Sequence, residues 1–557
     1  MKNCLRHILS VFFAFAFALA ACTEKPDVNT DGPDSGTQTP PQVDVELGDI
    51  SLLDYSYAGY DHGQSVPSYS GYTTYNVLDY KGKDMTDREA FLAVLTEVLG
   101  KPKIDGNNAI SFPAKSQANA VIYFPEGEYI LHDSSDDTSA GNTPSGASCS
   151  QTILIPAGNI VLKGAGADKT LITMKAPMQP KSESVLYSSP EMIQFKHNSG
   201  LSAITAVDGD ARKGEFGVHV ENAGQLSVGD WVCLYVKNND PELVRKEVEP
   251  YEPGANWLIA TSGVEVYDYH QIKYFMGNKV FFHEPLMHDV EAKHGWEIRK
   301  YPHYENVGIE DITFRGYAKD NFKHHGSWED DGGYKPLNLM RVTNSWVRRV
   351  DFESVSEALN IVNSANVSAY CISMKGNRGH SSVRSQASSR VLIAGTKDET
   401  SEGLGNFHAV GVSKHSIGTV LLRNIWGDDS CFESHANQPR ATLIDHCKGA
   451  LLVGHQGGNA NEAPHHLSDL VLWNFEATKT DGNGSFIWWD PSITYWRLLP
   501  PVIVGFHSME PVTFTEEHVK TVSHGVKVSP ESLYESQLAA RGHVPGWINE
   551  VKTYINN

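Results

Sequence analysis

Cysteine is scarce in this sequence, with seven residues in a chain of 557. None of the seven has the spacing of a metal-binding motif, so the sequence gives no sign of a zinc-stabilised fold. Five follow the N-terminal region, too few for a disulfide scaffold, although they leave room for one bridge in an oxidising compartment. They are Cys149, Cys233, Cys371, Cys431 and Cys447. A large apolar core must therefore hold the fold together.

Positive charge is also in short supply, because the formal net charge is −21 at pH 7. This balance argues against nucleic acid as a partner. Residues 370–460 are an exception, since nine Lys and Arg side chains there face seven Asp and Glu, with six histidines besides. One region of the chain is thus electrically distinct from an acidic remainder.

The N-terminus begins with a long apolar run, MKNCLRHILSVFFAFAFALAAC. The run is too short and wrongly flanked for a membrane span, and predicts a signal peptide over residues 1–22. Leu19 to Cys22 match the cleavage box of bacterial lipoproteins, so we expect a lipid on Cys22; a secreted protein with a chance cysteine is the alternative. Residues 23–45, rich in Pro, Gly, Asp and Thr, predict a flexible linker. Contact with a membrane is expected through the lipid anchor only.

Between about residues 307 and 476 the sequence shows no helical periodicity of useful length. Instead, short runs of Val, Ile, Leu and aromatic residues begin near positions 307, 345, 366, 389, 418, 440 and 469, with Gly, Asn and Ser between them. Short strands that recur once per coil predict a right-handed parallel β-helix. A β-sandwich would need hairpin signals such as Asn-Gly, and few occur. We therefore expect an all-β chain with its β-helix over residues 46–510.

Two segments depart from the repeat. Residues at about 205–300 alternate like antiparallel strands and predict an inserted β segment, which could border a cleft or cover one end of the β-helix. Residues 511–557 predict a capping segment with a C-terminal helix. For that helix, Ser529 is the expected N-cap and Gly542 the expected end.

The first coils carry a family resemblance. A turn with Asp84 and Asp87 precedes an expected helix, and the patterns VIYFPEGEY and LKGAG follow, with Pro125, Gly127, Tyr129, Gly164 and Gly166 in the matching places. These motifs resemble the start of pectate-lyase-like β-helix proteins, although the usual Asp-Asp pair is here Asp87-Arg88. The overall organisation of the chain, with a lipoprotein box and a linker before the β-helix, resembles that of lipid-anchored chondroitin sulfate and hyaluronan lyases. The resemblance implies a lipoprotein at the outer membrane or cell surface of a Gram-negative bacterium.

The resemblance also implies an acidic polysaccharide substrate, cleaved by β-elimination or by hydrolysis. Elimination needs a cation that neutralises the uronate carboxylate, a base for the C5 proton and an acid for the leaving oxygen at C4. Residues 405–440 supply those groups. A glycoside hydrolase using Asp428 and Asp429, and a non-catalytic glycan-binding lipoprotein, are the alternatives.

His408 and His435 lie in successive coils and can stack as a base and acid pair, or as a ladder that only stabilises the coil. Lys414 and Arg384 complete the expected catalytic set, as carboxylate anchors. A further set is expected to bind substrate. It comprises His380, His415, Arg440, His455, Trp328 and Tyr334. Each of them also has a purely structural interpretation, as a turn, an inter-coil bridge or a buried aromatic.

Asp428, Asp429 and Glu433 could bind Ca²⁺, or Glu433 could orient an imidazole. No cofactor is required by the sequence, and we expect catalysis without a metal because Arg384, Lys414 and Arg440 can supply positive charge. The protein is expected to act as a monomer.

Overall fold

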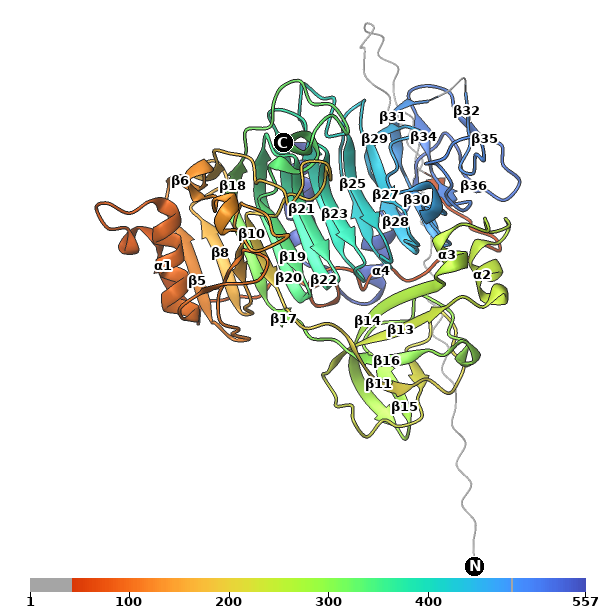
Figure 1. The fold of residues 1–557 in the computed structure, drawn as a ribbon. Helices are drawn as coiled ribbons and strands as arrows, with labels where there is room; N and C mark the ends of the chain where they lie inside the picture. Colours follow the sequence, from red (N-terminus) through yellow and green to blue (C-terminus); the bar gives the residue numbers. More distant parts are fainter. Residues whose placement is uncertain (1–42, 482–483) are drawn as a thin grey trace, which may run out of the picture. The chain divides into compact units, whose positions relative to one another are not determined.

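The structure, a computed structural model, describes residues 43–481 and 484–557. From β21 to β28, successive strands alternate between two sheets, and each strand pairs in parallel with the strand one coil away. This pattern confirms the right-handed parallel β-helix (Figure 1). The predicted signal peptide, the lipidated Cys22 and most of the predicted linker lie outside the described residues.

One sheet has nine strands in the described part of the chain. In spatial order they are β27 (Cys431–His435), β25 (His408–Ser413), β23 (Ser381–Gln386), β21 (Glu357–Val362), β19 (Leu337–Met340), β10 (Ile193–Lys196), β7 (Ile153–Ile155), β4 (Ile110–Ser111) and β3 (Lys103–Ile104). All neighbours are parallel except β3 and β4. This nine-stranded sheet carries the candidate site described below.

A second sheet runs alongside. It contains β2 (Thr73–Asn76), β5 (Ala120–Phe124), β8 (Ile160–Gly164), β18 (Val307–Arg315), β20 (Val342–Glu353), β22 (Ala365–Lys375), β24 (Leu392–Asp398), β26 (Val420–Leu422), β28 (Thr442–Asp445), β30 (Leu470–Trp473), β33 (Val502–Val504) and β36 (Lys520–Val522), with β6 (Gly127–His132), β9 (Thr170–Met174) and β17 (Tyr304–Glu305) beside them. Strands β29 (Lys448–Leu451), β31 (Glu476–Thr480) and β34 (His507–Ser508) form a third, and β32 (Ser485–Phe486) pairs with β35 (Thr513–Phe514). Because β36 pairs with β33, coil stacking continues past the expected end at residue 510.

The core consists of apolar side chains stacked coil upon coil. One such row occupies matching registers of the second sheet and is fully buried. It runs Ile309, Val347, Ala369, Ile393, Leu421, Ile444, Leu472 and Ile503. Each residue of the row packs on the next, which explains why the repeated apolar runs in the sequence predict the fold.

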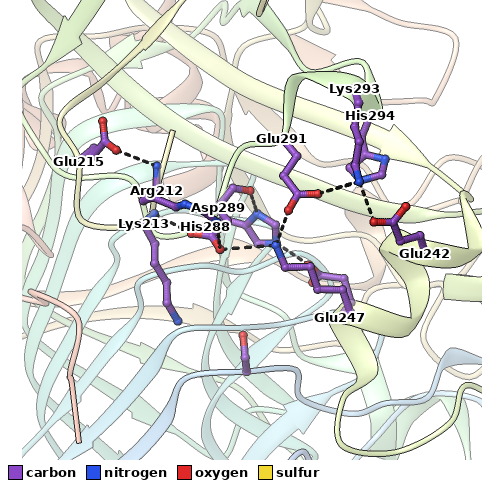
Figure 2. A network of polar contacts seen from close by, with 12 residues as sticks. Arg212, Lys213, Glu215, Glu242, Glu247, His288, Asp289, Glu291, Lys293 and His294 are labelled. Carbon is purple, nitrogen blue, oxygen red and sulfur yellow. Dashed lines mark hydrogen bonds and ion pairs between the residues drawn. The ribbon is translucent and has the colours of Figure 1, made fainter. Parts of the chain in front are cut away.

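The expected inserted β segment is confirmed as an antiparallel sheet. Its strands are β11 (Ser202–Ala206), β12 (Gly217–His219), β13 (Trp231–Asn238), β14 (Val264–Met276), β15 (Lys279–Phe282) and β16 (Glu297–Lys300), accompanied by helices α2 (Pro241–Val248) and α3 (Leu258–Thr261). Ion pairs bind its elements together, as in Figure 2, where Glu291 lies 3.1 Å from His294 and Glu247 lies 2.7 Å from His288. A fully buried pair, Arg390 with Asp268 at 2.7 Å, holds the insertion to the β-helix.

Helices cover the ends of the described chain. Helix α1 (Asp87–Leu99) starts at a Thr86 capping box with Glu89, and its Arg88 is buried and donates to the Leu131 carbonyl at 2.6 Å. The guanidinium therefore has a structural role at the position where the resembled family has Asp. The predicted linker is wrong in its last residues, because β1 (Val43–Asp44) pairs with β37 (Val528–Ser529).

The expected C-terminal helix is confirmed, but with a different start and a second helix after it. Helix α4 (Leu533–Ala540) begins after Ser532, not Ser529, because Asp445 accepts hydrogen bonds from the Ser532 hydroxyl and from the Tyr534 amide. Helix α5 (Trp547–Asn556) follows. All five cysteines in the described ranges are free thiols. Within those ranges, no helix combines the length and the apolar character that a membrane crossing requires.

Candidate functional site

A column of polar side chains crosses the nine-stranded sheet, one residue per coil. Strand register aligns Gln194, Asn338, Asn360, Arg384, Gly411 and Glu433. Flanking residues such as Leu337, Leu339, Leu359 and Ile361 belong to the core. Because side chains alternate along a strand, this outer column points away from the core, and neighbouring coils are about 4.8 Å apart. The column is interrupted at Gly411, and its side chains from Asn338 to Glu433 are largely buried.

Opposite charges pair within the outer column. Arg384 Nη2 lies 2.8 Å from Glu433 Oε2, and both side chains are buried. Glu433 Oε1 also lies 3.6 Å from His408 Nδ1 and 4.0 Å from His435 Nε2. The carboxylate of Glu433 therefore faces two imidazoles and one guanidinium, so the expectation that it could orient a histidine agrees with its position.

Six histidines gather over this part of the sheet, and we call them the histidine cluster. They are His324, His325, His380, His408, His435 and His455. Three of them come from two long loops: His324 and His325 from residues 316–336 between β18 and β19, and His455 from residues 452–469 between β29 and β30. The ring of Phe407 lies between His324, at 3.8 Å, and His455, at 4.3 Å, in nearly parallel stacks. Phe407 thus joins the two loops over the strands.

His408 is buried beneath that stack, with 1% of its surface exposed. Its Nδ1 donates to the His455 carbonyl at 2.7 Å, while His455 Nδ1 donates to the Phe407 carbonyl at 2.9 Å. The expectation that His408 acts as a catalytic base or acid is wrong, because both loops cover the imidazole and separate it from a ligand. Its contacts agree with the structural alternative, in which the imidazole bridges neighbouring segments.

His435 is more accessible, with 32% of its side chain exposed. It ends strand β27 in register with Ser413, and the next residue, Lys414, donates its amide to the Ala436 carbonyl at 2.8 Å. The Lys414 side chain is exposed. Gly457 packs so closely that a Cβ there would collide with the His435 ring and with Glu433 Oε1 at 2.6 Å. His435, Lys414 and the half-buried His455 are therefore the cationic or basic groups within reach of a ligand.

Burial lowers the pKa of three imidazoles of the histidine cluster, those of His324, His408 and His435. Desolvation, followed by the neighbouring His380 and His325, lowers the pKa of His324 to about 3. Desolvation also lowers the pKa of His408 well below its usual value, with His380 and Arg384 adding to the effect. The pKa of His435 is lowered by desolvation, against the opposing attraction of Glu433. Near neutral pH, His435 is thus an unprotonated base.

This electrostatic state predicts a pH dependence of stability. Because His324 binds a proton more weakly in the folded state than the usual pKa of 6.5 allows, acid favours the unfolded chain. We expect the free energy of unfolding to fall as pH drops from about 7 toward about 5, where few carboxylates titrate. His324→Gln should flatten that slope in urea titrations at several pH values. An unchanged slope in the variant would contradict the account.

The structure does not bring every predicted residue to the cluster. His415 lies 3.5 Å from Glu265 of the insertion, and burial lowers its pKa to about 4. Arg440 is buried and pairs with Glu247 at 2.8 Å, beside the network of Figure 2. Both side chains hold the insertion to the coils. The expectation that they contact substrate together with His408 is therefore wrong.

The expectation that Tyr334 binds substrate is also wrong. Tyr334 is buried in the main core, and burial raises its pKa to about 12. Trp328 is half-buried in the same loop, next to Gly333. The Tyr334 ring therefore presents no open face to a sugar, and the role of the half-buried Trp328 stays a prediction.

The predicted acidic site does not assemble. Asp429 accepts from Arg378 at 2.7 Å, Asp428 accepts from Thr478 at 2.7 Å, and Glu433 faces Arg384. The three carboxylates have separate partners, so they do not fit a Ca²⁺ site, and no catalytic step is assigned to that ion. The expectation that catalysis needs no metal stays a prediction.

Several polar residues of the site were not singled out from the sequence. Glu357 accepts from Asn360 at 2.9 Å, lies 3.4 Å from His380 and 3.7 Å from Lys335. Asn338 donates to Glu191 at 3.4 Å. The repeated pattern of an apolar, a polar and an apolar residue in LNLM and LNIV could have revealed the column. His324 and His325 had no such signal, because they lie in a loop.

A cavity of about 320 Å³ lies elsewhere, between the second sheet and α5. Its charged groups already pair with one another, for example Arg423 with Glu535 at 2.7 Å and Lys448 with Glu476 at 2.7 Å. We therefore place the candidate site at the histidine cluster and the outer column.

Comparisons with known proteins give a family without an assigned role. Residues 405–551 match a family described as a domain of unknown function, DUF4955. No curated protein sequence matches the chain. Among solved structures, the Gp54 tailspike of Acinetobacter baumannii bacteriophage AP22 is 10% identical with a TM-score of 0.40, and the match covers 80% of this chain and 58% of that one.

Two other solved structures are similar at the same level. The A-module of the mannuronan C-5 epimerase AlgE4 from Azotobacter vinelandii is 10% identical with a TM-score of 0.35, covering 82% of this chain and 97% of that one. The surface adhesin PfbA of Streptococcus pneumoniae is 10% identical with a TM-score of 0.35, covering 80% of each chain. The function must therefore be argued from the site.

Proposed function

We propose that this protein is a polysaccharide lyase that cleaves a uronic-acid-containing glycan by β-elimination. One observation carries the proposal. The partly exposed imidazole of His435 lies two residues beyond Glu433 of the outer column, and the exposed Lys414 follows Ser413, the residue in register with His435. The sequence resemblance favours glycosaminoglycans such as chondroitin sulfate or hyaluronan as the substrate.

The accessible groups can share the reaction. The Lys414 ammonium neutralises the uronate carboxylate, so that the C5 proton becomes more acidic. His435 takes that proton, and the electron pair forms the C4–C5 double bond as the C4–O bond breaks. His455 enters the step as the imidazolium, with Nδ1–H donated to the Phe407 carbonyl, and gives its Nε2 proton to the departing oxygen. The proton taken up by His435 then passes through solvent, which restores both imidazoles for the next cycle. Arg384 and Glu433 act as positioning residues, because their ion pair fixes the Glu433 carboxylate beside His435.

A hydrolase is the second candidate, and it now rests on a different pair of carboxyl groups. Burial, partly offset by Lys335, raises the pKa of Glu191. For Glu357 the attraction of Lys335, His380 and Arg384 outweighs burial and lowers the pKa. One carboxyl group with a raised pKa and another with a lowered pKa, both at the nine-stranded sheet, are typical of a general acid and a general base. Asp428 and Asp429 lack this arrangement.

We further propose that the protein is exported and anchored by a lipid on Cys22, and that it acts as a monomer. The lipoprotein box and the linker composition support the anchor. A Cys22→Ala variant should lose the lipid and leave the membrane fraction. Retention of that variant in the membrane would contradict the anchor.

A substrate screen tests the reaction type. The purified protein without its signal peptide is incubated with a panel of uronic-acid polymers and with neutral glycans as controls. Elimination creates a double bond conjugated with the carboxylate, so products should absorb in the near ultraviolet as reducing ends appear. Reducing ends without absorbance would favour hydrolysis by Glu191 and Glu357, and binding without any product would favour a glycan-binding protein.

A further inference from the structure

Three imidazoles of the histidine cluster converge at its edge. His324, His325 and His380 each offer a ring nitrogen, and these atoms lie within 4.8 Å of one another. The ring centres of His324 and His325 are 3.8 Å apart, and that of His380 is 5.3 Å from His324. Two of the histidines come from the loop over residues 316–336, and the third precedes strand β23 on the sheet below.

Carboxylates hold two of the three rings. His325 Nδ1 lies 2.6 Å from Asp331 Oδ2, and His380 Nδ1 lies 3.4 Å from Glu357 Oε1. Both carboxylates are buried, so the contacts are well shielded. A carboxylate on one ring nitrogen fixes the tautomer and leaves the other nitrogen as a basic acceptor, which is the arrangement found around metal-bound histidines.

The third ring has an unused nitrogen. His324 Nε2 is buried without a hydrogen-bond partner, while the ring face is stacked on Phe407. A shared cation would use one nitrogen from each of the three rings.

We propose that His324, His325 and His380 bind a divalent transition-metal ion, such as Zn²⁺, and leave one coordination position open. Imidazole nitrogens suit Zn²⁺ and its neighbours and do not suit Ca²⁺ or Mg²⁺. Zn–N bonds of about 2.0–2.1 Å place nitrogens about 3.4 Å apart in a tetrahedron. The exposed His325 must therefore move toward the other two rings.

Metal binding would fix the loop over residues 316–336 to the sheet, above His408. The proposal does not depend on the lyase reaction, since it rests on His324, His325 and His380, which take no part in the proposed proton transfers. The predicted absence of a catalytic metal is also compatible with it.

The test is metal binding by the purified protein after removal of metal with a chelator. Calorimetric titration with Zn²⁺ should show one site per chain, and titration with Co²⁺ should give the visible absorption of a nitrogen-bound ion. His325→Ala, whose side chain is largely exposed and should not disturb folding, should weaken binding by about 100-fold or more, since even an outer carboxylate is worth about 10 to 100-fold. Asp331→Asn should weaken it by about 10 to 100-fold.

His219→Ala is the matched control, because His219 is exposed and pairs with Asp208 on the insertion. It should leave Zn²⁺ affinity unchanged. The proposal is overturned if the wild-type protein binds no Zn²⁺, or if His325→Ala binds it as tightly as the wild type. Neither result depends on whether a glycan is cleaved.

Discussion

Replacing His435 with Ala is expected to lower turnover of an acidic glycan by about 10² to 10⁴-fold, the usual contribution of a general base. The imidazole ends strand β27, is unprotonated near neutral pH and has 32% of its side chain exposed. Its nearest charged partner is Glu433 at 4.0 Å, too far for a strong hydrogen bond. The loss should therefore appear in kcat, while the free energy of unfolding changes by less than about 1 kcal/mol.

His446→Ala provides the comparison for this variant. His446 has 22% of its side chain exposed and lies 3.6 Å from Glu531, in the bend between β28 and β29, outside the nine-stranded sheet. It should keep full activity. If His435→Ala also kept full activity, the base would have to be sought elsewhere on the outer column, and the assignment of His435 would be wrong.

Glu433→Gln is expected to cost about 3 to 5 kcal/mol in free energy of unfolding. The change keeps the shape of the side chain but removes the charge that faces the buried Arg384 guanidinium at 2.8 Å. Since both side chains are buried, water cannot compensate the unpaired cation. Urea unfolding of the wild type and the variant measures the difference.

A second substitution separates the charge effect from packing. Combining Glu433→Leu with Arg384→Met replaces both ions by apolar groups, so most of the lost stability should return. If the free energy of unfolding of Glu433→Gln lay within about 1 kcal/mol of the wild-type value, the ion pair would be hydrated. Arg384 would then not hold Glu433 in a fixed position beside His435.

The fold could be predicted because its signal is local and repeated. Apolar runs recur once per coil, and the buried row from Ile309 to Ile503 shows that each run packs on the next. The same spacing placed His380, His408 and His435 in successive coils, which the structure brings together with His455.

The errors in the site have long-range causes. Arg440 and His415 bind Glu247 and Glu265, residues of an insertion far away in the sequence, and no coil spacing could reveal those partners. His408 is buried because loops from two other coils fold over it. His324 and His325 come from one of those loops, whose path depends on contacts such as Asp331 with His325.

Cleavage in water enriched in heavy oxygen tests the central claim most directly. Elimination breaks the C4–O bond without adding water, so mass spectra of the fragments should show no heavy oxygen fixed at the cut and one end lighter by a water molecule. The wild-type protein should give that result on its uronic-acid substrate, and His435→Ala should give almost no fragments. One heavy oxygen incorporated per cut would contradict the lyase account and assign the reaction to hydrolysis.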